Sequence, residues 1–500
     1  MYLLDGITTM IKCILKRSEG QNNNSAGVFF RGIQLIVAVL VCCVLGSCAP
    51  AVLKHPVKLS YEPLQFSFPQ AEQVKLSNGI ELYLLEDKEL PLVNLTALVR
   101  TGSIYEPADK AGLASLTGTV MRTGGTASLS GNEINEKLEF IAGVVETSIG
   151  REVGSASLSV LKKDIDMGLT IFADVLIQPS FSQDQVELAK QKMMEGVRRQ
   201  NDDPQGIAFR EFRRTLFDNG PRGRVPTLET VSGISRDDMV AFHREYFHPD
   251  NIIMGVSGDF ERDELVKKLE TLLESWEPRA LSFPALKLPA DREEKSVYYA
   301  HKDIPQSTIV MGSFAVNKTH PDYFPFTVLN FVIGGGGFTS RLMSEIRSNR
   351  GLAYSVGSIY RAEIDYGLFA TYCFTKSEST LESITLISEI LKQVKQEGIT
   401  QAELERAKNS ILKNFIFGFT TPFQIVNKQV AIAFDNLPKD FLEIYRERIT
   451  AVTLEEVNAV AQKYLHPGQM LLVVVGNSDN FDSPLSQWGP IQEISLEETL

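Results

Sequence analysis

The histidines of the chain are the first residues to consider for metal or acid–base chemistry, and their spacing offers no metal site. There are six, and the two closest in sequence, His243 and His248, are five residues apart. Side chains five apart do not project from one face of a helix, as ligands of a shared metal must. We interpret His243 as a helix-surface residue and His248 as a helix-end residue, with His466 in the place equivalent to His248.

The N-terminal region has the features of an export signal. An uncharged apolar run, Ile33–Leu45, follows Arg31 and suits the core of a signal peptide better than a membrane span. It ends at Leu45-Gly46-Ser47-Cys48, which resembles a bacterial lipoprotein signal. The resemblance implies a lipidated Cys48 facing the periplasm, and Ala49 favours the outer membrane. The alternative is that residues 33–45 remain as an uncleaved anchor helix.

Cysteine usage and charge exclude two classes of site. Removal of residues 1–47 would take away Cys13, Cys42 and Cys43, and lipidation would occupy Cys48. With Cys373 alone, neither a disulfide framework nor a cysteine metal site can form. The mature chain would hold 46 basic and 60 acidic residues, a net charge of −14. An acidic surface argues against nucleic acid as a partner.

Four consecutive glycines, Gly334–Gly337, could suggest a phosphate-binding loop. The Lys-Ser/Thr that completes such a loop does not follow them, so this signal is weak. Whatever their role, the glycines supply backbone freedom.

A repeat within the chain sets its domain organisation. Ser182–Lys190 and Thr400–Lys408 both open with a helix N-cap residue, and they lie 218 residues apart. The same offset separates Ser235–Pro249 from Thr453–Pro467, each of which ends in Tyr-x-His-Pro. Matches in two separate regions at one offset indicate a duplicated domain.

Each copy begins with strands and continues with helices. Apolar residues alternate with period two over 80–84, 93–99 and 309–313, which predicts sheets with one buried face. Long helices are predicted over 161–177 and 378–396. Strands mixed with helices, without regular alternation, favour an α+β fold in which each half is a mostly antiparallel sheet layered with helices.

These patterns divide the chain into six segments. Prolines at 278, 284 and 289 mark the connection between the two halves. The predicted segments are a leader (1–47), a linker (48–70), a first domain (71–275), a second linker (276–296), a second domain (297–480) and a tail (481–500).

Several short stretches resemble the insulinase/pitrilysin family of zinc peptidases, which includes mitochondrial processing peptidase. The stretches are Ala111–Ala114, Thr123–Thr126, Gln178–Phe181 and, most specifically, Ser340–Val356. The resemblance covers roughly residues 70–480. It implies two tandem homologous domains that form half of a peptidase clamshell, with the zinc motif of the first domain lost.

The family binds zinc through an H-x-x-E-H motif on a helix, with a distant glutamate as the third ligand. Aligned on Ala111–Ala114, the two histidine positions are Ser115 and Thr119, and the position of the general base is Gly118. The third ligand falls at Gly196, although a one-residue slip would restore Glu195. Neutral hydroxyls are poor zinc ligands and glycine has no donor, so we expect no metal in this chain.

The resemblance also implies residues that are retained. In the family, an arginine and a tyrosine of the second domain contact substrate near the zinc, and Arg347 and Tyr354 have the matching spacing. A fixed cation and a phenol donor can stabilise developing oxyanion charge. Substrate peptides of the family add as strands to a sheet edge, and a strand near Val145–Leu161, interrupted by Gly150 and Gly154, is the candidate here.

The sequence therefore favours a non-catalytic subunit of a periplasmic two-chain zinc peptidase. This chain would supply Arg347, Tyr354 and part of a chamber for peptide substrates, while a heterodimeric partner of the same family would supply the zinc. One alternative is a non-proteolytic structural or assembly scaffold of the same fold. Another is a peptidase active alone, but a serine mechanism at Ser115 has no histidine predicted nearby.

Overall fold

The computed structural model describes residues 69–290 and 296–497. The predicted leader and Cys48 lie outside these residues, as does almost all of the linker 48–70. Within the described residues, none of the helices combines the length and the apolar composition that a bilayer crossing needs.

The first half of the described chain is one sheet with helices packed on it. Its strands are β1 (Glu72–Lys75), β2 (Glu81–Glu86), β3 (Leu92–Val99), β4 (Val144–Ile149), β5 (Gly154–Leu161) and β6 (Ile252–Gly258). Its helices are α3 (Leu113–Thr123), α4 (Gly131–Phe140), α5 (Ile165–Ile177), α6 (Gln183–Arg199), α7 (Pro204–Leu216), α8 (Leu228–Ser232), α9 (Arg236–Tyr246) and α10 (Arg262–Leu273).

The second half repeats this plan. Its strands are β7 (Ser296–His301), β8 (Gln306–Ala315), β9 (Ala353–Ala362), β10 (Gly367–Lys376), β11 (Leu471–Gly476) and β12 (Ile491–Glu493). Its helices are α11 (Tyr323–Asn330), α12 (Thr380–Glu397), α13 (Gln401–Ile416), α14 (Pro422–Phe434), α15 (Phe441–Ala451) and α16 (Leu454–Tyr464). The predicted α+β fold with two homologous, mostly antiparallel sheets is confirmed.

Strand order shows the duplication directly. The first sheet runs β1-β2-β6-β3-β5-β4 and the second runs β12-β7-β11-β8-β10-β9. The five strands β2-β6-β3-β5-β4 of the first sheet correspond in order to β7-β11-β8-β10-β9 of the second. In both sheets the first two of these strands are parallel, β2 with β6 and β7 with β11. The remaining edge differs, because β1 precedes its neighbour in the chain whereas β12 comes from the C-terminus and pairs parallel with β7.

The structure changes the predicted limits of the second domain. Residues 481–500 were expected to form a tail, but they supply β12 to the second sheet, and Leu485 is buried. A three-residue strand carries too little periodicity to be recognised from sequence. Between the halves, 274–290 contains no helix or strand. Contacts with the first half hold it at several points: Trp276 donates to the Phe247 carbonyl at 3.2 Å, Arg279 pairs with Glu245 at 3.0 Å, and the Phe283 ring packs against Tyr105.

Helix starts in the two halves use the same capping chemistry. Ser235 caps α9 in a reciprocal capping box with Asp238, and Thr453 caps α16 in the same way with Glu456. At the other end of each repeat, His248 hydrogen-bonds the Arg244 carbonyl at 2.7 Å, and His466 hydrogen-bonds the Lys463 carbonyl at 2.9 Å. The structural role predicted for these two histidines at helix ends is confirmed.

The prediction for His243 was wrong. This residue is not on the helix surface but buried, with its Nε2 2.9 Å from the Leu176 carbonyl and its ring stacked on Phe247. Burial lowers the pKa of His243 to about 4, so the imidazole is neutral near pH 7. An isolated histidine in a helix cannot reveal from sequence which neighbour covers it.

The predicted strand over 145–161 is a hairpin of two strands. β4 ends at Ile149, the chain turns at 150–153, and β5 begins at Gly154. β4 alone is the sheet edge, and β5 pairs on both sides. The helix predicted to begin at 161 begins at Ile165 for the same reason, since β5 extends to Leu161.

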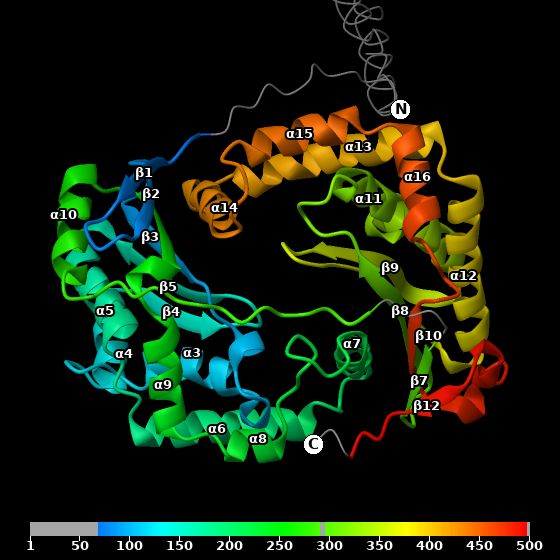
Figure 1. Cartoon of the computed structure of the whole chain (residues 1–500), viewed down its shortest axis with the longest axis horizontal. Coiled ribbons are helices and arrows are strands. Elements are labelled where there is room, and N and C mark those ends of the chain that lie inside the picture. The colour runs from blue at the N-terminus through cyan, green and yellow to red at the C-terminus, as the bar shows by residue number, and fades with distance from the viewer. Residues whose placement is uncertain (1–68, 291–295, 498–500) are drawn as a thin grey trace, which may run out of the picture. The chain divides into compact units, whose positions relative to one another are not determined.

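The two halves exchange one helix each. α7 of the first half packs on β8 and β11 of the second sheet, and α14 of the second half packs on β6, β2 and β3 of the first (Figure 1). A side chain added at Gly255 on β6 would lie 2.3 Å from Val426 of α14, so only glycine allows this close packing. Because each half buries part of its sheet under the other half's helix, the two halves stabilise one another.

Candidate functional site

Helix α3 carries the three positions that match the lost zinc motif. Its N-terminus is held by the buried carboxylate of Glu106, which accepts hydrogen bonds from the Gly112 and Ala114 amides at 2.9 Å each. Ser115 and Thr119 lie one turn apart on the exposed face of α3, whereas Gly118 is buried on another face. The helix spacing therefore places the two histidine positions together, as a shared metal would require.

A cavity of about 420 Å³ lies between α3 and α6, where the zinc would be expected. Thr119 from α3 and Gly196 from α6 both line it. The other lining residues are Leu116, Ala189, Lys192, Met193, Val197, Gln200 and Pro226. We call this cavity the α3–α6 hollow. The structure thus brings two predicted site positions together, while Ser115 does not line the hollow.

The alternative third ligand, Glu195, points elsewhere. Its carboxylate forms ion pairs with Arg199 at 2.7 Å and Arg198 at 3.6 Å along the exposed side of α6. A side chain added at Gly196 would meet nothing within 4 Å. Gly196, rather than Glu195, is the position of α6 that opens into the hollow.

Gly118 stands in a different environment from the other positions. A Cβ added there would lie 2.4 Å from the Ile149 amide nitrogen and 2.8 Å from the Ser148 carbonyl carbon, both backbone atoms of β4. The Thr147 hydroxyl also donates to the Gly118 carbonyl at 2.6 Å. Strand β4 therefore fills the space that the side chain of a general base would need.

The residues present do not fit a zinc ion. The Thr119 hydroxyl donates to the Ser115 carbonyl within its own helix at 3.0 Å, and neither glycine has a side chain to donate. Within residues 69–290 and 296–497, no three histidine, cysteine, aspartate or glutamate side chains gather closely enough to hold a metal. The hollow is an open cavity at the position of the family's zinc site, but it has no side chains suited to bind zinc.

The second half presents an exposed cluster around Arg347. The Arg347 guanidinium lies over the rings of Phe338, at 4.9 Å from its centroid, and Tyr354, at 5.6 Å. Tyr354 is 81% exposed and Phe338 69% exposed, so both rings face solvent. We call these three residues the Arg347 cluster; in it, the structure brings together the two residues that the sequence singled out.

Phe338 was missed by the sequence analysis. It directly follows the glycines 334–337, and a large apolar residue beside a glycine run is a signal that could have found it. Both segments that flank it are π-helical, Phe331–Gly335 before it and Met343–Asn349, which carries Arg347, after it. Such π-helical turns are rare and occur often at functional sites.

A half-buried ion pair fixes the base of this region. Arg341 donates two hydrogen bonds to Glu403 of α13, at 2.7 and 2.8 Å. Burial tends to raise the pKa of Glu403, but the hydrogen bonds from Arg341 and Thr400 outweigh it and lower the pKa to about 2. The pair holds the segment that leads to Arg347 against α13.

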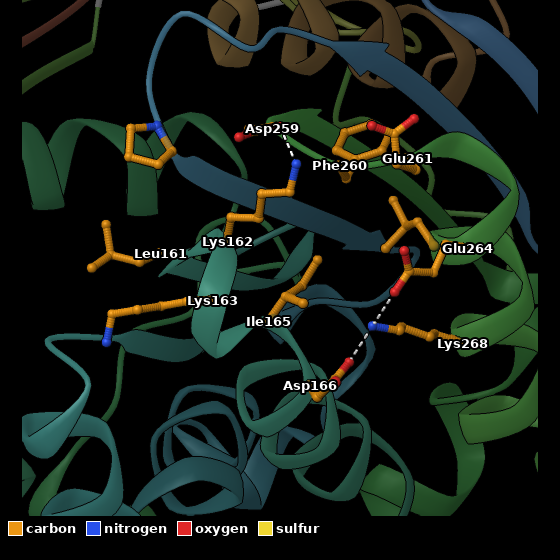
Figure 2. A pocket seen from close by; sticks show the side chains of 12 residues that line it. Leu161, Lys162, Lys163, Ile165, Asp166, Asp259, Phe260, Glu261, Glu264 and Lys268 are labelled. Atoms are coloured by element: carbon orange, nitrogen blue, oxygen red, sulfur yellow. Dashed lines mark hydrogen bonds and ion pairs between the residues drawn. The ribbon is translucent and has the colours of Figure 1, made fainter.

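Another cavity lies elsewhere in the first half, beside α5 and α10 (Figure 2). Its volume is about 670 Å³, and apolar side chains such as Ile165 and Leu265 line it. Its charged groups bind one another, Lys162 to Asp259 at 2.6 Å and Lys268 to both Asp166 and Glu264. Because these charges are already paired and no predicted site residue lines the cavity, we do not assign it a function.

Two family models match the chain in tandem. Residues 83–228 match insulinase (peptidase family M16), and residues 233–411 match the peptidase M16 inactive domain. The chain belongs to the insulinase-like M16 family. The part matched as insulinase contains α3, which lacks the zinc motif, and the part matched as the inactive domain contains the Arg347 cluster.

Curated relatives of this M16 chain carry two kinds of name. An uncharacterized zinc protease of Rickettsia bellii is 24% identical over 406 residues, which are 80% of this chain and 90% of the relative. The non-peptidase homolog YmxG of Helicobacter pylori is 26% identical over 396 residues, 78% of this chain and 90% of the relative.

Solved structures share the fold. The peptidase M16 inactive domain from Pseudomonas fluorescens superposes with a TM-score of 0.76 at 24% identity, covering 83% of this chain and all of that one. The periplasmic protease PqqL from Escherichia coli matches 84% of this chain but only 48% of its own, with a TM-score of 0.69 at 16% identity. These likenesses and the absent donors fit a non-catalytic M16 member.

Proposed function

We propose that this protein is the non-catalytic subunit of a two-chain zinc peptidase, and that it contributes the Arg347 cluster and part of a peptide chamber to a zinc-bearing partner of the same family. One contrast carries the proposal. The space beside the position of the general base is filled by β4, whereas the partly buried Arg347 guanidinium lies over the exposed ring of Tyr354, where both can contact a second molecule.

The partial match to PqqL supports a two-chain arrangement. This chain corresponds to about half of the chain of PqqL, named as a periplasmic protease, so a complete enclosure of that kind needs a second half. A partner of the same family with intact zinc ligands would provide both the missing half and the metal.

The sheet edges support a role in peptide binding. β4 and β9 are the terminal strands of their sheets, and each pairs on one side only among the described strands. An extended peptide can add to such an edge through main-chain hydrogen bonds, independently of its sequence. The subunit would then align substrate while the partner cuts it.

A lipid anchor on Cys48 would hold the complex at the periplasmic face of the outer membrane. The apolar run 33–45 and the lipoprotein-like signal support this location. Metabolic labelling with a fatty-acid analogue tests it: we expect label in the wild-type chain and none in Cys48→Ser. A mature chain that retains residues 33–45 would instead indicate an anchor helix.

The central experiment measures peptide cleavage by the reconstituted complex. The chain is purified from native membranes with its bound partner, and cleavage is compared with that of the partner alone. We expect faster cleavage by the complex, and a loss of about tenfold or more in kcat for Arg347→Ala with unchanged complex formation. The control is Arg350→Ala, which removes an exposed arginine already paired with Glu345.

The other outcomes identify the alternatives. Equal cleavage by the complex and by the partner alone would contradict the proposal. Unchanged activity in an Arg347→Ala, Tyr354→Phe double variant would favour a structural or assembly scaffold. Stoichiometric zinc together with cleavage by the isolated chain would show that it is a peptidase by itself.

A further inference from the structure

We propose that three arginines at the meeting point of the two halves, Arg151, Arg213 and Arg361, bind the carboxylates of an acidic peptide segment. This inference rests on the proposed function, because it assigns a class of substrate to the same peptide chamber. We call the three residues the arginine triad.

The triad is assembled from both halves. Arg151 lies in the turn between β4 and β5, Arg213 lies on the last turn of α7, and Arg361 lies near the end of β9. The halves touch at this place: Arg222 of the first half bonds Asp365 of the second, and the Tyr366 hydroxyl donates to Glu152 at 3.2 Å. No single segment of sequence contains the site.

The carboxylates near the triad are already engaged. Glu152 and Asp365 both bind Arg222, and Glu363 binds Arg361 at 2.7 Å. Arg151 and Arg213 form no ion pair with any residue that the structure describes. The triad therefore holds more positive charge than its surroundings neutralise.

Arg213 carries an unsatisfied hydrogen-bond donor. Its Nε is buried and has no hydrogen-bond partner among the described residues. Burial and the neighbouring positive charge of Arg151 lower the pKa of Arg213 to about 10, so the guanidinium stays charged at neutral pH in an unfavourable place. An unpaired, half-buried cation costs stability, and native proteins tolerate such costs mainly at functional sites.

The position of Arg151 favours a peptide as the source of the anion. β4 ends at Ile149, so a peptide added along its free edge has one end beside the turn that carries Arg151. Guanidinium groups bind carboxylates through two parallel hydrogen bonds, which suits glutamate and aspartate side chains. The chain as a whole is acidic, with 62 acidic and 50 basic residues, so this local excess of positive charge departs from the general surface.

Fluorescence anisotropy with labelled peptides tests the site on the purified chain, without the partner. The probes are hexaglutamate and hexalysine, and inorganic tripolyphosphate serves as a competitor that is an anion but not a peptide. We expect hexaglutamate to bind and hexalysine not to bind, with affinity falling as salt rises. Arg213→Met should weaken hexaglutamate binding about tenfold or more.

Melting temperature separates a binding role from a structural one. Arg213→Met keeps a long apolar side chain and removes the unpaired charge, so we expect a melting temperature equal to or above that of the wild type. Arg350→Gln changes the net charge by the same amount at an ion-paired arginine and should leave hexaglutamate binding unchanged. If Arg213→Met does not fold, Arg151→Gln and Arg361→Gln, which alter more exposed positions, provide the same comparison.

Equal hexaglutamate binding by the wild type and the triad variants would overturn the inference. So would tight binding of tripolyphosphate with no binding of hexaglutamate, which would identify a phosphate site instead. A complex that fails to speed cleavage while hexaglutamate binding stands would contradict the proposed function but not the triad.

Discussion

The α3–α6 hollow of the first half and the Arg347 cluster of the second half have changed in opposite ways. In the hollow, the positions of the family's zinc ligands are Thr119 and Gly196. Strand β4 fills the space next to Gly118, yet Gly196 still opens into an empty region. The Arg347 cluster keeps a cation between two exposed rings. The comparison teaches that the first half has replaced the zinc ligands and base of the family, whereas the second half presents side chains that can contact another molecule.

The two glycines at former site positions give the sharpest test of this comparison. Gly118→Glu should lower the free energy of unfolding by about 3 kcal/mol or more, because its Cβ must displace the backbone of β4. Gly196→Glu should change it by less than about 0.5 kcal/mol, since nothing lies within 4 Å. Urea unfolding measures both, and equal effects would show that β4 does not close the site.

Acid titration tests the first half through the buried His243. The pKa of buried His243 falls from 6.5 to about 4, so between these values the unfolded chain binds more protons and the folded state loses stability as pH drops. The expected loss is about 3 kcal/mol from pH 6.5 to pH 4. The free energy of unfolding, measured at a series of pH values, should change less steeply in this window for His243→Gln than for the wild type. An unchanged slope would contradict the burial of His243.

Restoring the ligands without the base would sharpen the comparison further. In Ser115→His, Thr119→His, Gly196→Glu the two imidazoles lie one turn apart on α3, and the carboxylate approaches from α6. We expect zinc to stabilise this variant by about 2.7 kcal/mol at a hundredfold excess over Kd, without peptide cleavage. The matched control retains Gly196, and comparable zinc binding by that control would show that the carboxylate introduced on α6 does not bind the metal.

A smaller pH effect belongs to the second half. The pKa of Glu403 is lowered to about 2, so the Arg341–Glu403 pair contributes stability above the ordinary glutamate pKa, and this contribution is lost as pH falls from about 4.5 towards 2. Because the pair is partly exposed, we expect about 1–2 kcal/mol. This loss should be absent in Glu403→Gln when the free energy of unfolding is measured against pH. Below pH 4 it is separate from the loss caused by His243.

Much of the fold could be predicted from local patterns. The 218-residue offset predicted two homologous domains, and Ser235 and Thr453 marked helix starts that the structure confirms. The short strand β12 was missed because three residues show no clear period. The hairpin at 150–153 was missed because its glycines were interpreted as an interruption of one strand and not as a turn between two strands. Local signals succeed where an element is long enough to repeat its pattern.

The sequence alone determined which donor atoms this chain has, and hence that Ser115, Gly118 and Thr119 cannot act as the family's zinc ligands and base. Only the tertiary structure decided that Gly118 is closed off by Ile149 while Gly196 stays open, and that Arg151 and Arg213 lie near enough to Arg361 of the other half for their charges to repel one another. The physical reason is that donor chemistry belongs to each side chain, whereas the space and charge around it depend on segments that only folding brings together.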